Sequence, residues 1–269
     1  MAPLLSVESL VMRYAARGPG GSRAAVAALD EVSFSVAAGA TLALAGASGS
    51  GKSTLAMCLA CLERPTGGRI LLEGRDLTAL GESELRAVRP EIQLVFQDPS
   101  GSLNPRLTAL EIVTEPFLIQ GRYTTVEHVE RARGLFERVG LSFRAASRRV
   151  AEFSGGQRQR LAIARALALE PRLLILDEAL SALDASVQAQ IANLLLKLRE
   201  CAGLTCVFIT HDLAMAARVA DDVAILERGR IVERGSPDEV LRRPGHAATR
   251  ALIAATPPWN ARPQGQAGR

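Results

Sequence analysis

The segment Gly46–Thr54 constrains the fold of this chain more than any other stretch of the sequence. It reads Gly-Ala-Ser-Gly-Ser-Gly-Lys-Ser-Thr and matches the phosphate-loop pattern, G-x-x-x-x-G-K followed by Ser or Thr, at every fixed position. An apolar run, Thr41–Ala45, precedes the segment, and a helical run, Leu55–Leu62, follows it. Because the motif requires a strand before it and a helix after it, this agreement argues against a simple Gly/Ser-rich turn.

The residue types of this segment have direct physical reasons. Glycines let the backbone curl and turn consecutive N–H groups inward, where they and the following helix N-terminus can hold a polyphosphate. Lys52 adds a positive charge at the β- and γ-phosphates, and the Ser53 hydroxyl is placed to ligate Mg²⁺. We therefore expect a nucleoside triphosphate to bind to the whole loop: Gly46, Ala47, Ser48, Gly49, Ser50, Gly51, Lys52, Ser53 and Thr54.

The composition sets wide limits on the remaining interpretation. A chain of 269 residues, 48% of them hydrophobic, can form one large domain or a domain with a subdomain. No apolar run reaches the about 18 residues that cross a bilayer, and Met1–Ser6 lacks the charged-then-apolar pattern of a signal peptide. We therefore expect a soluble intracellular chain.

The formal net charge of +4 comes almost wholly from arginine, since Lys52 and Lys197 are the only lysines. The arginines are spread along the chain between acidic residues, so genome composition explains the excess of arginine better than a nucleic-acid-binding surface does. We therefore expect no nucleic-acid partner. Cys58 and Cys61 lie in the helical run after the loop, where small core residues explain them better than a metal site. Disulfides are not expected in a reducing compartment.

Short strands accompany the phosphate loop. Period-two alternation predicts strands over Ser6–Val11 and Val32–Val36, and Ile70–Leu72 continues the pattern, so that these strands form a β subdomain. Tyr14 follows the first of them. Two interpretations of Tyr14 are open: an aromatic platform for an adenine ring, or an ordinary aromatic residue at the end of a strand.

A neutral amide and a change of pattern follow the buried strand Ile92–Phe96. Gln97 stands at the carboxyl end of this strand, from which it can reach a metal ion or an attacking water. Turn signals then mark a boundary, and residues 103–169 are mainly helical. The pattern is clearest over Thr125–Val139, which follows a capping box at Thr124, and it predicts an inserted helical subdomain.

The segment Phe153–Arg160 contains a second glycine motif at the start of a helix. Ser154, Gly155 and Gly156 can present a hydroxyl group and bare N–H groups to a phosphate, with the helix dipole behind them. An ordinary helix start is the alternative, because Ser154 and Gln157 also satisfy the capping-box rule. Taken alone, this motif leaves both interpretations open.

Two carboxylates end the continuous apolar strand that begins at Leu173. Such a strand delivers acids to the edge of a parallel sheet at which nucleotides bind. Asp177 can hold Mg²⁺ directly or through water, and Glu178 can polarise the water that attacks the γ-phosphate. His211 ends another buried strand and is either a contact to the same phosphate or a structural histidine, while Asp184 begins an amphipathic helix.

In this order the motifs resemble those of the ATP-binding subunits of ABC transporters, over roughly residues 4–255. The resemblance rests on the phosphate loop, Gln97, Ser154–Gln157, Asp177, Glu178, Asp184 and His211. It implies an α/β fold with a P-loop NTPase core of the RecA-like type, an N-terminal antiparallel β subdomain and an inserted helical subdomain. The implied limits are 1–96 and 170–240 for the core with its β subdomain, 97–169 for the helical subdomain with the second glycine motif, and 241–269 for a C-terminal tail.

The resemblance also implies a mechanism with ATP and Mg²⁺ as cofactors. Two cassettes face each other head to tail, and the segment that caps the nucleotide of the partner is Ser154, Gly155, Gly156 and Gln157. The residues implied for Mg²⁺ are Ser53, Gln97 and Asp177, and those for catalysis are Glu178, His211 and Gln97. Asp184 is implied as a contact between the two cassettes.

The same resemblance implies partners and a location. The partners are a second ATPase subunit, identical or paralogous, two transmembrane permease subunits and, indirectly, an extracytoplasmic solute-binding protein. The Gln97 loop and the helical subdomain would receive a helix of the membrane subunit. The chain would therefore be peripheral on the cytoplasmic face of the inner membrane.

Two stretches are similar to the dipeptide, oligopeptide and nickel uptake group: Phe96–Pro105 and Ser181–Gln190. They imply import of peptides or of nickel and metal chelates, while the solute itself is recognised by other subunits. The tail at His246 resembles the group's His-Pro-Tyr-Thr-Arg segment but lacks its Pro and Tyr. No cysteine follows Cys206, so the iron–sulphur cluster of some peptide-system relatives is not expected.

Three alternatives from other classes stay open. A non-transport ABC ATPase of DNA repair or translation usually carries two cassettes, a long coiled coil or a zinc insertion, and none of these is visible in the sequence. A soluble P-loop kinase has no use for Ser154–Gln157. An ABC exporter subunit is the third alternative, because the direction of transport is implied only by family resemblance.

Overall fold

A six-stranded sheet carries the predicted phosphate loop and the two carboxylates. The computed structural model describes residues 3–17, 23–181 and 183–255. The strands lie in the order β10-β9-β3-β8-β7-β6, and neighbours run parallel except β10, which is antiparallel to β9. Their bounds are β3 Thr41–Ala45, β6 Ile92–Val95, β7 Leu173–Asp177, β8 Thr205–Thr210, β9 Asp222–Glu227 and β10 Arg230–Gly235.

The N-terminal segments form a second, antiparallel sheet in the order β2-β1-β4-β5. Its strands are β1 Pro3–Arg17, β2 Arg23–Ala37, β4 Gly67–Leu72 and β5 Arg75–Asp76. The two long strands extend beyond the predicted Ser6–Val11 and Val32–Val36, and their backbones still pair at the exposed residues Ala15 and Ala25. Alternation of apolar residues marks only the half-buried part of a strand, so it gave bounds that were too short.

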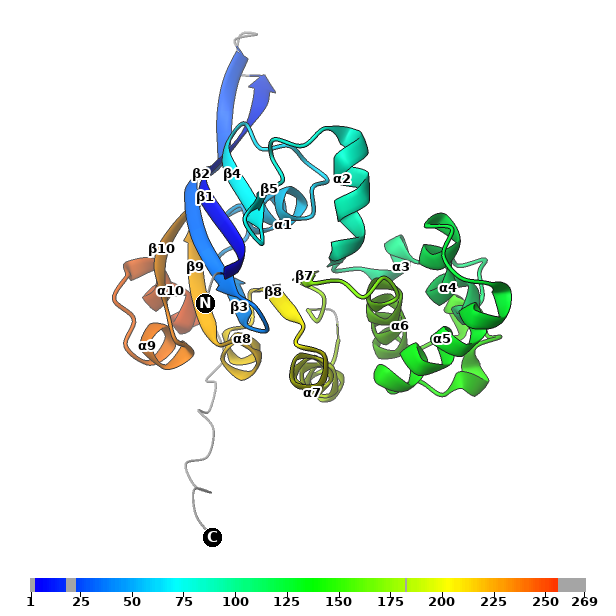
Figure 1. Ribbon diagram of the computed structural model, residues 1–269. Coiled ribbons are helices and arrows are strands. Elements are labelled where there is room, and N and C mark those ends of the chain that lie inside the picture. The colour runs from blue at the N-terminus through cyan, green and yellow to red at the C-terminus, as the bar shows by residue number, and fades with distance from the viewer. Residues whose placement is uncertain (1–2, 18–22, 182, 256–269) are drawn as a thin grey trace.

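Helices cover the parallel sheet and build the insertion. Their bounds are α1 Lys52–Leu59, α2 Glu82–Val88, α3 Pro99–Ser102, α4 Ala109–Ile119, α5 Thr125–Arg138, α6 Gly155–Leu167, α7 Ala185–Ala202, α8 Leu213–Val219, α9 Pro237–Arg242 and α10 Ala247–Ala255. Figure 1 shows α1 and the antiparallel sheet on one side of the parallel sheet and α7 and α8 on the other, with α4, α5 and α6 grouped to the right of β7.

Both faces of the parallel sheet are buried, which explains the continuous apolar runs of its strands. Successive side chains of a strand point to opposite faces, and β7 shows the consequence. Leu173 and Ile175 join the hydrophobic cluster that contains α1 and the antiparallel sheet, whereas Leu174 and Leu176 join the cluster that contains α6 and α7. All four side chains are 0% exposed.

The helical segment expected after residue 103 is present. α5 lies close to the predicted Thr125–Val139, and Thr124 caps it as expected, since its side chain accepts the N–H of Glu127. One hydrophobic cluster joins α4, α5 and α6 to β7 and α7. Because packing continues across the expected boundary, the limits 97–169 for a helical subdomain stay a prediction.

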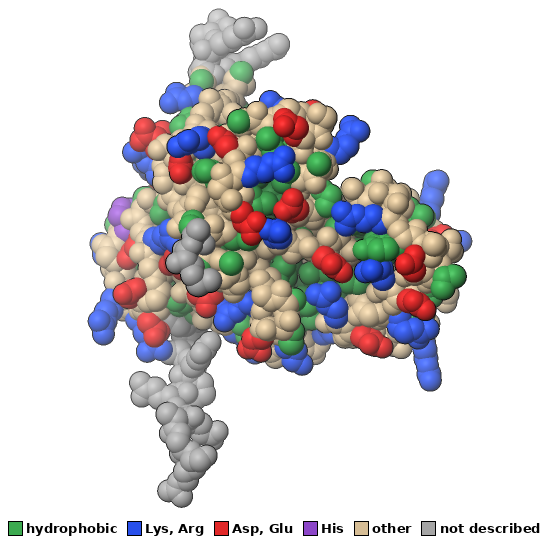
Figure 2. Space-filling view, viewed as in Figure 1, with side chains coloured by type: hydrophobic (Ala, Val, Ile, Leu, Met, Phe, Trp, Pro, Cys, Tyr) green, Lys and Arg blue, Asp and Glu red, His purple; other side chains and the backbone are tan. Residues whose placement is uncertain are grey.

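The surface carries charges of both signs. Figure 2 shows Lys and Arg side chains lying between Asp and Glu side chains over the face that it presents, without a large area of one sign. Within the described ranges, none of the helices has the length and apolar character that crossing a membrane requires. The architecture as a whole is the expected α/β fold, with a parallel core sheet, an antiparallel N-terminal sheet and a helical insertion.

Replacing Phe136 by Ala should lower the free energy of unfolding by about 3–5 kcal/mol, because this side chain is 0% exposed and its loss leaves a cavity. On the same helix, Val126→Ala should change that free energy by no more than about 0.5 kcal/mol, because Val126 is 69% exposed. Urea unfolding followed by circular dichroism measures both variants. Equal losses in the two variants would contradict the packing described for α5.

Candidate active site

Four strand ends meet at the carboxyl edge of the parallel sheet, and each of them carries predicted site residues. β3 leads into the phosphate loop, β6 into Gln97, β7 into Asp177 and Glu178, and β8 into His211. The parallel register of β3, β8 and β7 brings their ends level with one another. Motifs that lie far apart in the sequence are thereby brought to one edge, where nucleotides bind in open α/β sheets.

The phosphate loop is shaped by glycines that the surrounding backbone requires. Gly49 and Gly51 have φ angles of +77° and +106°, which favour glycine. A Cβ atom at Gly46 would lie 2.3 Å from the carbonyl oxygen of Leu226, and one at Gly51 would lie 2.4 Å from that of Ala28. At Gly49 no atom lies within 4 Å of the corresponding position. The loop is therefore enclosed by backbone at its two ends and open in its middle.

Lys52 lies at the centre of the site, with its side chain 5% exposed. Its Nζ donates hydrogen bonds to the carbonyl oxygens of Gly46 and Ala47, at 2.9 and 3.0 Å, and lies 3.8 Å from Oε1 of Glu178. Burial lowers the pKa of Lys52 below its ordinary value, against the raising effect of the Glu178 and Asp177 charges. The ammonium group is thus removed from water and held by its own loop.

Glu178 is held between two cationic or polar groups at the end of β7. Its φ angle of +46° is uncommon for a residue with a Cβ atom, and its N–H donates to the carbonyl oxygen of Ile209 at 3.0 Å. Oε2 lies 3.3 Å from Nδ1 of His211, while Oε1 faces Lys52. Uncommon backbone angles of this kind cluster at catalytic positions, and a fixed carboxylate suits a general base.

Asp177 provides the test of whether the site fits a divalent cation. Its Oδ1 atom is buried and has no hydrogen-bond partner. Burial raises the pKa of Asp177; the nearby Glu178 charge raises it too, whereas a hydrogen bond with Ser53 and the Lys52 charge lower it. An unpaired buried carboxylate oxygen beside a hydroxyl is the donor set that Mg²⁺ prefers, so the residues present fit the ion.

Gln97 joins the site through a chain of hydrogen bonds. Its Nε2 donates to Oγ of Ser181 at 3.2 Å, and Ser181 Oγ donates to the carbonyl oxygen of Glu178 at 2.9 Å. Sequence reasoning missed Gln188, whose Nε2 donates to the carbonyl oxygen of Leu180 at 2.9 Å and fixes the turn after Glu178. Only the repeated glutamines of Ser181–Gln190 gave a signal for it.

Tyr14 lies on β1, 40% exposed, and its hydroxyl group donates to the carboxylate of Glu63. The pKa of Tyr14 is raised, first by this hydrogen bond and then by burial, while a hydrogen bond with Thr54 of the phosphate loop lowers it. Tyr14 therefore stands beside the first turn of α1. Glu63 was not singled out from the sequence, because a contact across 49 residues leaves no local pattern.

The second glycine motif and Asp184 serve as helix caps within this chain. Ser154 Oγ accepts the N–H of Gln157 at 3.4 Å, and Gln157 Oε1 accepts the N–H of Ser154 at 3.1 Å, so the capping box is present. Asp184 caps α7 in the same way, through the N–H of Val187. In the described part of the chain these side chains reach neither the phosphate loop nor the β7 carboxylates.

Gly156 is fixed by packing, while the two residues before it are exposed. A Cβ atom at Gly156 would lie 2.3 Å from Cγ1 of Val187, so this position brings α6 against α7. Ser154 and Gly155 are exposed. The start of α6 therefore presents a hydroxyl group and backbone N–H groups outward, although these residues also satisfy the plain capping interpretation.

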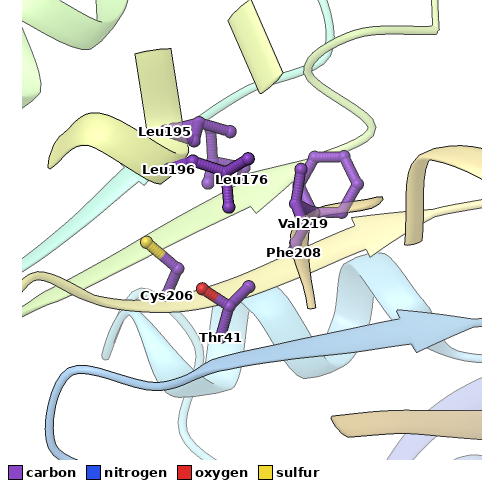
Figure 3. Close-up of a pocket in the computed structure, with 7 residues that line it drawn as sticks. All are labelled: Thr41, Leu176, Leu195, Leu196, Cys206, Phe208 and Val219. Atoms are coloured by element: carbon purple, nitrogen blue, oxygen red, sulfur yellow. The ribbon is translucent and has the colours of Figure 1, made fainter. Parts of the chain in front are cut away.

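The interior of the fold offers no competing site at its cysteines. A cavity of about 10 Å³ beside Cys206 has hardly enough room for one water molecule. Figure 3 shows the residues that line it, among them Leu176 and Phe208, and most of their side chains are apolar. Burial raises the pKa of Cys206 and of Cys58 to about 12 and that of Cys61 to about 11. All four cysteines are free, and over the described ranges no group of three or more His, Cys, Asp or Glu residues is placed to hold a metal ion.

Comparison with known proteins shows which family this chain resembles. A family model described as "ABC transporter" matches residues 29–181. The probable peptide ABC transporter ATP-binding protein y4tS of Sinorhizobium fredii is 51% identical over 257 residues, which are 94% of this chain and 72% of that protein. The dipeptide transport ATP-binding protein DppF of Escherichia coli K12 is 44% identical over 96% of this chain and 78% of its own length.

Solved structures agree with this match. The dimeric post-hydrolysis state of the ATP-binding cassette MJ0796, bound to ADP and Pi, has a TM-score of 0.77 and 32% identity over 87% of this chain and 98% of that chain. The cbiO1 protein of Clostridium perfringens has a TM-score of 0.79 and 27% identity over 90% and 92% of the two chains. These likenesses confirm the expected P-loop NTPase fold. Since the family match covers more than half of its residues and the relatives align over most of their length, this chain belongs to the ABC transporter family and is an ATP-binding and ATP-hydrolysing cassette.

Proposed function

We propose that the chain is the ATPase subunit of an ABC importer for peptides. The observation that carries this proposal is the identity of 51% and 44% to a probable peptide transporter subunit and to a dipeptide transport subunit, over nearly the whole chain. The names of these relatives favour peptides over nickel or metal chelates, which the sequence resemblance had left open. They favour transport over the non-transport alternatives in the same way, and the name of a further relative, a putative peptide import ATP-binding protein of Brucella ovis that is 46% identical, favours import.

The phosphate loop, in this proposal, binds the triphosphate of ATP, and the ring of Tyr14, a residue that is 40% exposed, stacks on the base. Lys52 Nζ is bonded to two carbonyl oxygens of its own loop, and phosphate oxygens would replace them as stronger, charged acceptors. Ser53, Asp177 and Gln97 would hold Mg²⁺, which neutralises charge on the β- and γ-phosphates. The buried free Oδ1 of Asp177 supports this assignment.

Glu178 is the proposed general base. Its carboxylate would orient the attacking water and take its proton as the water attacks the γ-phosphorus. Lys52 and His211 hold the two oxygens of this carboxylate in place, at 3.8 and 3.3 Å. Gln97 is linked through Ser181 to the backbone of Glu178, so a movement of the Gln97 loop would reach the catalytic carboxylate.

The proposed transporter also requires partner subunits. Ser154, Gly155 and Gly156, with Gln157, would cap the nucleotide of a second cassette, which the exposure of Ser154 and Gly155 supports, and Asp184 would lie at that contact. Two permease subunits would anchor the pair at the cytoplasmic face of the inner membrane. A solute-binding protein would deliver the peptide from outside.

Glu178→Gln should leave ATP affinity close to that of the wild type and slow hydrolysis by about 10²–10⁴-fold, because the amide keeps the shape of the side chain but cannot accept the proton. Phosphate release and calorimetric titration with ATP measure the two effects separately. Lys52→Ala is the contrasting variant, since it should weaken ATP binding itself. Unchanged turnover in Glu178→Gln would exclude its role as base.

The facing-cassette arrangement is tested in the same background. Glu178→Gln should accumulate an ATP-dependent dimer in size-exclusion chromatography, and adding Ser154→Arg should abolish it, because a large cation would occupy the place of the cap. Val126→Arg, at a residue that is 69% exposed on α5, is the matched control and should leave the dimer intact. A dimer that survives Ser154→Arg would count against the model.

Transport is tested by co-expressing the chain with the permease and solute-binding proteins encoded beside it. The purified complex in lipid vesicles should take up labelled dipeptides when ATP is on the side of the cassettes, and uptake should stop with Glu178→Gln. Uptake of Ni²⁺ in the absence of peptide would show that the transported solute is nickel and not a peptide. Outward transport, or a chain that never co-purifies with membrane subunits, would refute the importer.

A further inference from the structure

The turn between β9 and β10 lies against the phosphate loop. Arg228 and Gly229 form this turn, with φ angles of +49° and +79°, the left-handed pair that a tight hairpin needs. The N–H of Gly229 donates a hydrogen bond to the carbonyl oxygen of Ser50 at 2.9 Å. A residue near the end of the chain therefore contacts the backbone of the loop that is expected to hold phosphate.

One carbonyl group of β2 holds the turn and the loop together. A Cβ atom at Gly229 would lie 2.7 Å from the carbonyl oxygen of Ala28, and a Cβ atom at Gly51 would lie 2.4 Å from the same oxygen. The two glycines thus approach Ala28 more closely than any other residue type allows. The close approach brings three segments, from β2, the phosphate loop and the hairpin, into one joint.

An ion pair fixes the turn to β2 from outside. The N–H of Asp30 donates to the carbonyl oxygen of Gly229 at 2.8 Å. Arg230, the residue after the turn, donates from Nε and Nη2 to Oδ2 of Asp30 at 2.8 and 2.6 Å. The N–H of Gly229 is therefore hydrogen-bonded to the phosphate loop, and its carbonyl oxygen is hydrogen-bonded to β2.

The contact with Ser50 decides which way the next N–H group points. The described peptide bonds are trans, and in a trans peptide the C=O and N–H groups point in opposite directions. Because the carbonyl group of Ser50 is directed at the hairpin, the N–H of Gly51 is directed away from it. Gly51 has the wide backbone freedom of glycine, so an untethered Ser50–Gly51 peptide could rotate.

We propose that the Arg228-Gly229 turn, held by the Asp30–Arg230 pair, is a positioning element of the nucleotide site that orients the Gly51 N–H group toward the phosphates. This inference rests on the proposed role of the phosphate loop. In this proposal the effect on the nucleotide is indirect. It passes through the backbone of Ser50, and no contact with the nucleotide is assigned to Gly229, Asp30 or Arg230. N–H groups aimed at an anion lose their value when they rotate, so the effect falls on phosphate binding.

The decisive comparison is Gly229→Ala against Gly74→Ala. Gly74 follows Glu73 in a turn with nearly the same φ angles, +49° and +80°, but no atom lies within 4 Å of its Cβ position. Both substitutions strain a left-handed backbone position, so both should lower the melting temperature. Only Gly229→Ala should weaken ATP binding, by about 10- to 100-fold, the range for a hydrogen bond to a charged group.

A milder series covers the case in which Gly229→Ala does not fold. Arg230→Ala should raise the dissociation constant and KM for ATP by about tenfold with little change in kcat, and Arg230→Lys should restore part of the affinity. Exchanging the pair, Asp30→Arg with Arg230→Asp, should restore more. The control is Arg69→Ala, which removes an exposed ion pair of 2.6 Å with Glu8 on the antiparallel sheet and should leave ATP affinity unchanged.

Calorimetric titration with ATP, on each variant well below its melting temperature, gives the answer. Wild-type affinity in folded Gly229→Ala or Arg230→Ala overturns the proposal, and so does an equal loss of affinity in Gly74→Ala. If Lys52→Ala binds ATP as tightly as the wild type does, the phosphate-loop assignment is overturned instead. The two failures are therefore told apart within one set of measurements.

Discussion

The site depends on the interactions that hold the buried ammonium group of Lys52. A charge removed from water must find partners, and here these are two carbonyl oxygens of its own loop and the carboxylate of Glu178. The partners come from different strands, so the charge can be satisfied only when β3 and β7 end at the same edge of the sheet. The same edge receives His211 from β8, which lies between them.

The surroundings of the site are built so that its parts depend on one another. Gln97 reaches Glu178 through Ser181, and Gly156 brings the start of α6 against Val187 on α7. The turn between β9 and β10 contacts the phosphate loop, because the N–H of Gly229 donates to the carbonyl oxygen of Ser50. A shift of the helical insertion or of the hairpin would therefore change the positions of groups around the nucleotide. Such dependence suits the proposed coupling of ATP hydrolysis to partner subunits.

Much of this could be predicted from the sequence, where the signal is local. The phosphate loop, the apolar strand before Asp177 and the helix after Thr124 each depend on residues within a few positions, and each lies where it was expected. Bounds were wrong where pairing continued beyond the buried part, as in β1 and β2. The partners of side chains were not predictable: Tyr14 meets Glu63, and Asp30 meets Arg230, which is 200 residues further along the chain.

Short stretches of sequence were enough to predict the chemistry of this protein: a glycine loop with its lysine, two acids at the end of an apolar strand, and a serine–glycine helix start. These are local patterns, because each needs only a particular backbone turn or strand end. Three other features became visible only in the folded chain: Lys52 lies 3.8 Å from Glu178, Asp177 keeps one buried oxygen without a hydrogen-bond partner, and the N–H of Gly229 donates to the carbonyl oxygen of Ser50. Such contacts depend on the order of strands in the sheet and on close backbone packing, and no short stretch of sequence contains that information.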